Sequence, residues 1–127
     1  MTLRMNISEA ESKVLEVFWR AAAPLSAEEV VTAMDNDREW SAGTIRTFLA
    51  RLVKKGALAA TPEGRRYLYE PLLRREDYVH ERSRDLIDRL FGGRIAPFIT
   101  HFSEREQLSR DEVEEFKKLI ARLDRER

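Results

Sequence analysis

Apolar residues recur along the chain at two different periods, and these periods predict where its helices and strands lie. The three-to-four-residue spacing of amphipathic helices is found over residues 9–20, 27–34, 42–55, 75–91 and 95–102, and again after Ser109. Residues 57–61 and 66–70 instead have the composition of strands, with turn-forming residues at 62–64 between them. The predicted fold class is therefore mainly α with a small β-wing.

Serine residues followed three positions later by glutamate mark several helix starts. This capping-box arrangement occurs at Ser8–Glu11, Ser26–Glu29 and Ser109–Glu112. Residues 21–25, which include Pro24, are expected to form the turn between the first two helices, and residues 35–39 a polar loop. Trp19 is expected at the edge of the core, and Trp40 in the staple position before Ser41.

The segment from Ser41 to Gly56 organises the rest of the chain. At 100° per residue, its apolar side chains gather on one side of a helix, and they are Ile45, Phe48, Leu49, Leu52 and Val53. The opposite face is small, hydroxylated and basic, and the helix contains no acidic residue. A solvated face normally mixes both charges, whereas this composition suits phosphates and base edges. The segment is therefore predicted to be a recognition helix.

Three short helices followed by a hairpin form the plan of a winged helix-turn-helix domain, predicted here for residues 1–71. Arg65 and Arg66 lie at the tip of the hairpin, where they could reach a phosphate or the minor groove. Solvated loop charges are the alternative interpretation for these two arginines. The residues predicted to contact DNA are Ser41, Thr44, Arg46, Thr47, Arg51, Lys54, Lys55, Arg65 and Arg66.

From Leu72 onward the charge density rises, and the segment 72–127 is predicted to be a helical dimerisation domain. Its helices carry large apolar stripes but are too short to enclose a core, so a second copy is expected to cover them. The alternative is a monomer in which these helices fold back onto the winged helix. The residues predicted to lie in the dimer interface are Val79, Leu86, Leu90, Phe91, Phe98, Phe102, Phe116, Leu119, Ile120 and Leu123.

The overall composition excludes several classes of function. Formal net charge is zero, but residues 41–66 carry six Lys or Arg residues against the single acid Glu63. The chain has no cysteine, which excludes disulfides, thiolate nucleophiles and cysteine metal sites. Neither a signal peptide nor a run long enough to span a membrane is found, so a cytoplasmic location without direct membrane binding is expected.

Catalytic motifs are absent from the sequence. His80 and His101 are the two histidines and fall on different predicted helices. No phosphate loop, HExxH motif or serine nucleophile elbow is found. The adjacent carboxylates Glu28/Glu29 and Glu114/Glu115 diverge on their helices and are interpreted as solvated faces. We therefore expect no enzyme activity, no metal site and no cofactor.

Several motifs together resemble the penicillinase repressor (BlaI/MecI) family. They are Ile7-Ser8-Glu9-Ala10-Glu11, Val14-Leu15 with Trp19, Trp40-Ser41 with Thr44 to Gly56, Gly64-Arg65 with Tyr67 and Tyr69-Glu70-Pro71, Leu90-Phe91-Gly92-Gly93, and Leu108-Ser109. The resemblance covers nearly the whole chain, and the block from Trp40 to Gly56 is its most specific part. It implies a homodimeric repressor on a dyad operator with TACA/TGTA-like half-sites.

The resemblance also implies a mode of inactivation. In the β-lactam circuit of this family, a membrane-bound sensor protease triggers repressor cleavage between an Asn and a Phe in the dimerisation helices. Alignment on Leu108-Ser109 places the corresponding bond at His101–Phe102, where His replaces the Asn. The copper-responsive branch of the family carries C-terminal cysteine pairs, which this chain lacks.

Two other functions remain as alternatives. A winged-helix module that binds a protein would be expected to expose apolar anchors on its third helix. A ligand-responsive regulator without proteolysis would hold a small molecule between Phe98, Phe102 and Phe116, although aromatic residues at helical spacing are more often core. Double-stranded operator DNA, a second copy of the chain and a sensor protease pathway are the expected partners.

Overall fold

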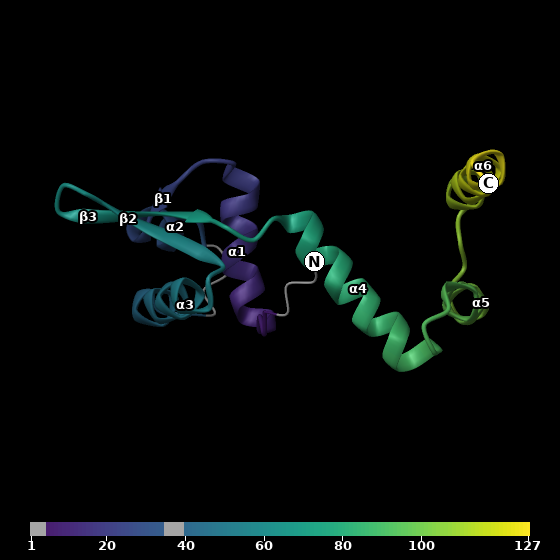
Figure 1. Cartoon of the computed structure of the whole chain (residues 1–127), viewed down its shortest axis with the longest axis horizontal. Helices are drawn as coiled ribbons and strands as arrows, with labels where there is room; N and C mark the ends of the chain where they lie inside the picture. Colours follow the sequence, from purple (N-terminus) through teal and green to yellow (C-terminus); the bar gives the residue numbers. More distant parts are fainter. Residues whose placement is uncertain (1–4, 35–39) are drawn as a thin grey trace. The chain divides into compact units, whose positions relative to one another are not determined.

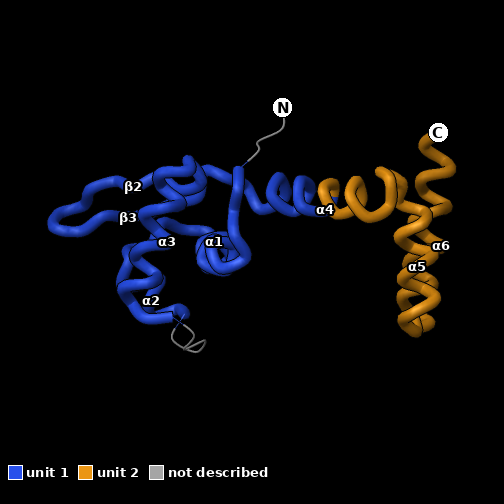
Figure 2. The backbone as a smooth tube through the Cα atoms, turned by 90° about the horizontal axis from the view of Figure 1, so that it is seen from below, with its two compact units in different colours: residues 1–83 blue, residues 84–127 orange. Residues whose placement is uncertain are grey.

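The computed structural model describes residues 5–34 and 40–127 (Figure 1). They divide into two compact units, residues 1–83 and residues 84–127 (Figure 2), with the boundary inside a long helix. The loop predicted at 35–39 and most of the lead-in before the first helix lie outside the described residues. The functional boundary predicted between residues 71 and 72 stays a prediction.

Three helices of the first unit begin and end where local signals predict. They are α1 (Glu9–Ala21), α2 (Ala27–Ala33) and α3 (Ala42–Lys55). Ser8 and Ser26 both form complete capping boxes, in which the glutamate three residues on accepts from the serine backbone N–H. At the end of α3, Gly56 takes φ 85°, a left-handed conformation that glycine adopts without strain.

The three-stranded antiparallel sheet has the order β1-β3-β2 and consists of β1 (Leu25–Ser26), β2 (Leu58–Glu63) and β3 (Arg66–Pro71). The sequence predicts a turn over residues 21–25, and the strand β1 found there is a correction: two residues are too few to show an alternating pattern. The position predicted for the hairpin turn is also wrong. Pro62 and Glu63 lie in β2, opposite Tyr67 and Arg66, and the turn is Gly64–Arg65. An edge strand such as β2 tolerates proline because one side of its backbone faces solvent.

The hydrophobic core of the first unit joins all three helices to the sheet. Its largest fully buried apolar side chains are Phe18, Leu15, Leu49, Leu52, Leu58, Val14 and Val30. The inward face predicted for α3 is confirmed for Ile45, Leu49 and Leu52, which are at most 2% exposed. The core therefore fixes which face of α3 turns outward.

Trp19 lies at the edge of this core, as predicted. Its indole N–H donates to the carbonyl of Leu73 at 2.9 Å, and its ring contacts Tyr78 at a centroid distance of 5.6 Å. Arg75 also binds Glu16 of α1 at 2.9 Å. These contacts attach the start of α4 (Arg75–Phe91) to the first unit.

The second unit contains the end of α4, then α5 (Ile95–Arg105) and α6 (Arg110–Arg125). Gly92 and Gly93 end α4 with φ values of 61° and 80°, and Arg84 donates to the Gly93 carbonyl at 3.0 Å and to Asp88 at 2.7 Å. The Ser109 hydroxyl caps α6 by accepting from the Glu112 N–H. Within the part of the chain that the structure describes, no helix is long and apolar enough to cross a membrane.

Candidate nucleic-acid interface

Helix α3 turns its polar face outward because its apolar face is held in the core. Ser41 caps the helix by accepting from the Thr44 N–H at 3.2 Å, and the hydroxyls of these two residues lie 3.0 Å apart. Further along, Arg46, Thr47, Arg51 and Lys54 are exposed. The Thr47 hydroxyl donates to the Gly43 carbonyl at 3.1 Å. The outward face thus offers cations and hydroxyls to a ligand.

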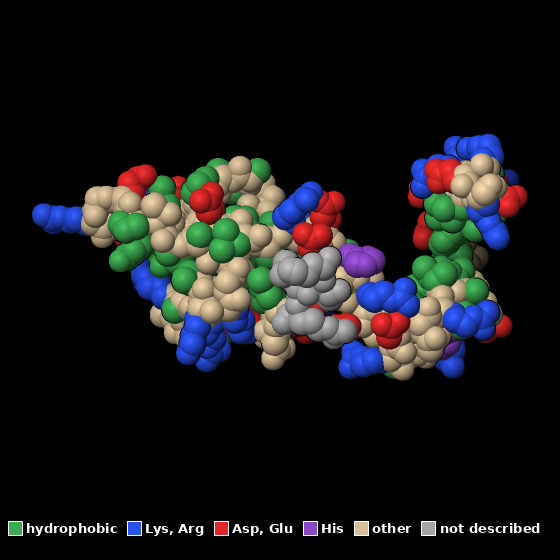
Figure 3. Space-filling model, viewed as in Figure 1, with side chains coloured by type: hydrophobic (Ala, Val, Ile, Leu, Met, Phe, Trp, Pro, Cys, Tyr) green, Lys and Arg blue, Asp and Glu red, His purple; other side chains and the backbone are tan. Residues whose placement is uncertain are grey.

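Basic side chains gather at two places on the first unit. Figure 3 shows Lys and Arg side chains beside α3 and at the tip of the β2–β3 hairpin. Arg65 occupies the hairpin turn, and the hairpin extends away from the three helices (Figure 1). This arrangement of a basic helix and a basic wing is the one that winged-helix domains use on duplex DNA.

The structure separates free cations from paired ones, which the sequence does not do. Among residues 5–34 and 40–127, Arg46, Arg51, Lys54 and Arg65 have neither a hydrogen bond nor an ion pair from their side chains. Arg66 pairs with Glu63 across the hairpin at 3.3 Å. The free cations are the ones that an incoming phosphate can bind without breaking an existing contact.

Lys55 is tied to the body of the domain. Its ammonium lies 2.6 Å from Glu11 Oε1 and 2.5 Å from the Asn6 carbonyl. Glu11 is 1% exposed and also accepts from the Ser8 N–H at 2.9 Å. Burial would raise the pKa of Glu11, but the hydrogen bonds from Lys55 and Ser8 outweigh it and hold that pKa below its usual value. Glu11 and Lys55 therefore form a partly buried ion pair between α1 and the end of α3.

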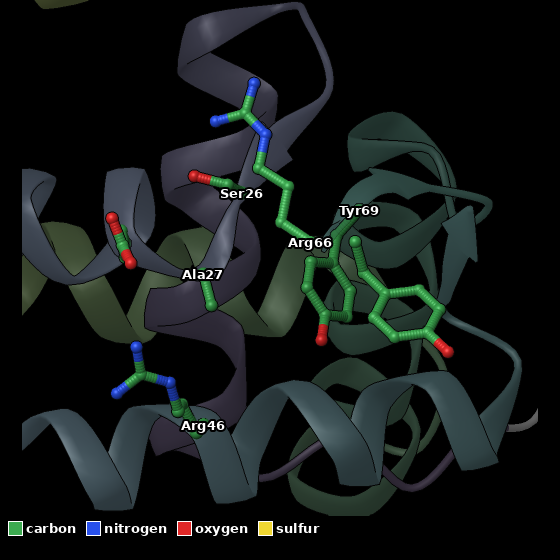
Figure 4. Close-up of a pocket in the computed structure, with 7 residues that line it drawn as sticks. Ser26, Ala27, Arg46, Arg66 and Tyr69 are labelled. Carbon is green, nitrogen blue, oxygen red and sulfur yellow. The ribbon is translucent and has the colours of Figure 1, made fainter. Parts of the chain in front are cut away.

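A cleft of about 180 Å³ opens where α2, α3 and β3 meet. In Figure 4 the side chains of Arg46 and Arg66 lie on either side of Ser26 and Ala27, and Tyr69 comes from β3. Its lining consists of Ser26, Ala27, Glu28, Arg46, Arg66, Tyr67 and Tyr69. Sequence reasoning did not single out Glu28, Tyr67 or Tyr69 as members of one site. Only the pairing of β1 with β3, which brings the start of α2 to the wing, unites them.

Apolar side chains are exposed on α4 and on the helices of the second unit. Among the residues predicted to mediate dimerisation, Leu90 is 68% and Ile120 62% exposed. Val79, Leu86, Phe102 and Leu123 are exposed as well, and Phe91, Phe98, Phe116 and Leu119 are half-buried. Exposed apolar residues on consecutive helices mark an interaction surface, but which partner covers them stays a prediction.

Aromatic rings form a row in the second unit. Phe98 contacts Phe91 at a centroid distance of 5.4 Å and Phe102 at 6.0 Å, and His101 lies 6.0 Å from Phe91. Phe116 and Leu119 line a separate pocket with Glu112 and Glu115. Phe98 thus packs on Phe91 and Phe102, but Phe102 is 47% exposed and Phe98 and Phe116 are half-buried. Both the core interpretation of these aromatics and the ligand alternative therefore stay predictions. The His101–Phe102 bond lies inside α5, so a protease would require local unwinding of that helix.

Within the described residues, no group of three His, Asp or Glu side chains could hold a metal ion. The winged-helix fold, the outward basic face of α3 and the basic wing together define a winged-helix DNA-binding regulator. Comparison with known proteins identifies the family. The model of the penicillinase repressor family matches residues 7–122.

Individual relatives agree with this match. The penicillinase repressor of Bacillus licheniformis is 34% identical over 115 residues, which cover 91% of this chain and 89% of that protein. The methicillin resistance regulatory protein MecI of Mammaliicoccus sciuri is 31% identical, with 91% and 93% covered. A solution structure of monomeric Bacillus licheniformis BlaI in complex with the blaP half-operator aligns with a TM-score of 0.53 and 38% identity, covering 61% of this chain and 94% of that chain.

The chain belongs to the penicillinase repressor family of DNA-binding transcriptional repressors. The predicted family and fold class are therefore confirmed. Members of this family are repressors and not enzymes, in agreement with the missing catalytic motifs.

Proposed function

We propose that this chain represses transcription by binding a dyad operator as a homodimer, with one α3 in the major groove of each half-site. The observation that carries the proposal is the outward face of α3, where exposed Arg46, Arg51 and Lys54 have no partner among the described residues and no acid lies on the helix. The half-operator complex of monomeric BlaI from Bacillus licheniformis supports the binding of operator DNA. Dimer symmetry predicts half-sites about one helical turn, roughly 34–36 Å, apart.

The chemistry of each predicted DNA-binding side chain indicates which part of the DNA it contacts. Arg46 is proposed to bind a guanine, because one guanidinium can bond O6 and N7 together. Thr44 and Thr47 face the same groove, and Ser41 lies at its edge. Arg51, Lys54, Arg65 and Arg66 are proposed to bind phosphates. Lys55 was predicted to do the same, but its bonds to Glu11 and Asn6 favour a structural role.

The second copy is proposed to cover the exposed apolar residues of α4, α5 and α6. A single half-site contact rarely gives useful operator affinity, and the exposure of Leu90 and Ile120 supports a partner at this surface. Inactivation through a sensor protease pathway, with cleavage at His101–Phe102, is proposed from the family resemblance alone.

Replacing Arg46 with Ala tests the assignment of the base-reading residue. Loss of a bidentate guanine contact should weaken binding to the dyad by about 1–3 kcal/mol and leave binding to a scrambled duplex nearly unchanged. Fluorescence anisotropy with both duplexes measures the two affinities.

The Lys54→Ala variant is the matched control for this experiment. As a phosphate contact, Lys54 should contribute about equally on both duplexes, and its loss should reduce the salt slope by about one. An equal loss on both duplexes for Arg46→Ala would contradict the base-reading role and make Arg46 another phosphate contact.

A further inference from the structure

The cleft between α2, α3 and β3 holds one acidic side chain beside the arginine proposed to read a base. Glu28 and Arg46 line the same space of about 180 Å³. Neither side chain has a hydrogen bond or ion pair with any described residue. Both are exposed, so both are available to a ligand that enters the cleft.

Glu29, the neighbouring acidic residue, has a structural role in the N-terminal cap of α2. Its carboxylate accepts from the Ser26 N–H at 2.8 Å in the capping box of α2. The hydrogen bonds from Ser26 lower the pKa of Glu29, and the charge of Arg66 adds to this effect. The cap therefore explains Glu29. Glu28 lies in the same first turn, where its charge favours the helix N-terminus, but its carboxylate has no hydrogen-bond or ion-pair partner among the described residues.

An unpaired acidic side chain beside a DNA-binding helix is expected to lower the affinity for DNA. A carboxylate near the phosphate backbone is repelled by it, and that repulsion does not depend on sequence. Glu28 therefore weakens binding to every duplex unless a donor neutralises it in the complex.

Arg66 also lines the cleft but is paired with Glu63, so Arg46 is the arginine there without a partner among the described residues. We argue that Arg46 can donate to Glu28 when it is seated on a guanine. Guanidinium has five N–H donors, and a guanine O6/N7 pair uses two of them. When Arg46 enters the groove and water is excluded, the remaining N–H groups need acceptors. Glu28 lies across the same cleft and can accept from them, which neutralises its own charge. On a duplex without guanine at that position, Arg46 is not seated and Glu28 stays repulsive.

We propose that Glu28 is a specificity-determining residue, which acts through Arg46 to widen the difference in affinity between operator and non-operator DNA. This inference rests on the proposed function. It assigns to Glu28 a positioning role for the base-reading arginine, in place of the solvated position that sequence spacing predicts.

The test compares Glu28→Gln with the unaltered chain, on the dyad and on a scrambled duplex, by fluorescence anisotropy across a salt series. Affinity for the scrambled duplex should rise, affinity for the dyad should rise less or fall, and the ratio between them should drop about tenfold, the size of one hydrogen bond to a charged group. In an Arg46→Ala background, the same substitution should raise both affinities by one common factor and leave their ratio unchanged.

Glu9→Gln is the matched control, because it makes the same charge change at an exposed position in the first turn of α1. It should leave the ratio of affinities unchanged. If Glu28 acts only as a repulsive charge, Glu28→Gln will raise the affinities for both duplexes equally in the chain that keeps Arg46. That result would overturn the inference. If the unaltered chain shows no preference for the dyad, the proposed function fails first, so the two failures are distinguishable.

Discussion

Replacing Ile120 with Glu should convert the protein to a monomer and weaken its binding to a dyad duplex by roughly 10²–10⁴-fold, the usual gain from linking two binding modules. Ile120 lies on α6 and is 62% exposed, so a carboxylate there does not disturb the fold of the single chain. In a dimer interface, however, the charge would be buried without a partner. Sedimentation velocity measures the oligomeric state, and anisotropy measures the affinity.

Ala121→Glu provides the matched control for this substitution. It introduces the same charge on the same helix at an exposed position, but its side chain points about 100° away from that of Ile120. This variant should remain dimeric and bind the dyad normally. A dimeric Ile120→Glu protein with unchanged affinity would show that α6 is not the interface.

Replacing Lys55 with Met should lower the free energy of unfolding by about 2 kcal/mol at neutral pH, because it leaves the buried Glu11 carboxylate without its charged partner. The value lies below the range for a fully buried ion pair because the Lys55 side chain is 32% exposed, whereas that of Glu11 is 2% exposed. Urea denaturation of both chains measures the difference. Lys54→Met is the control, since Lys54 has no partner among the described residues, and it should change the free energy of unfolding by less than about 0.5 kcal/mol.

The pH dependence identifies the ion pair as the cause of this loss. The pKa of Glu11 is lowered in the folded chain, so its contribution to stability is present above its pKa in the unfolded chain and is lost as pH falls through the folded value. Without Lys55, burial remains and favours the protonated carboxyl. The difference in stability between the two chains should therefore shrink on acidification, as pH falls from the Glu11 pKa of the folded Lys55→Met chain to the lowered Glu11 pKa of the unaltered folded chain. A difference that stays constant with pH would contradict the ion pair as its source.

Local signals in the sequence predicted most of the elements. Ser8, Ser26 and Ser41 accept the capping hydrogen bonds that their positions predict, and Gly56 ends α3. These signals involve residues a few positions apart, whose geometry follows from the helix itself. The same holds for the outward face of α3, since helical periodicity determines which residues share a face.

Contacts between distant residues could not be predicted in this way. Glu11 and Lys55 are 44 positions apart, and Trp19 and Leu73 are 54 apart, so nothing in the local pattern pairs them. For this reason the sequence grouped Lys55 with the DNA-binding cations and treated Glu28 as a solvated residue. Strand β1, which carries the start of α2 to the wing, gives no periodic signal because two residues are too few to alternate.

The most direct test of the account is the affinity of the unaltered protein for a TACA/TGTA dyad and for a scrambled duplex, measured by fluorescence anisotropy across a salt series. A marked preference for the dyad is expected, with the logarithm of affinity falling steeply as the logarithm of salt concentration rises. Equal affinity for the two duplexes would contradict operator recognition through these half-sites. Absence of binding to either duplex at low salt would contradict the DNA-binding role of this face and favour a protein partner.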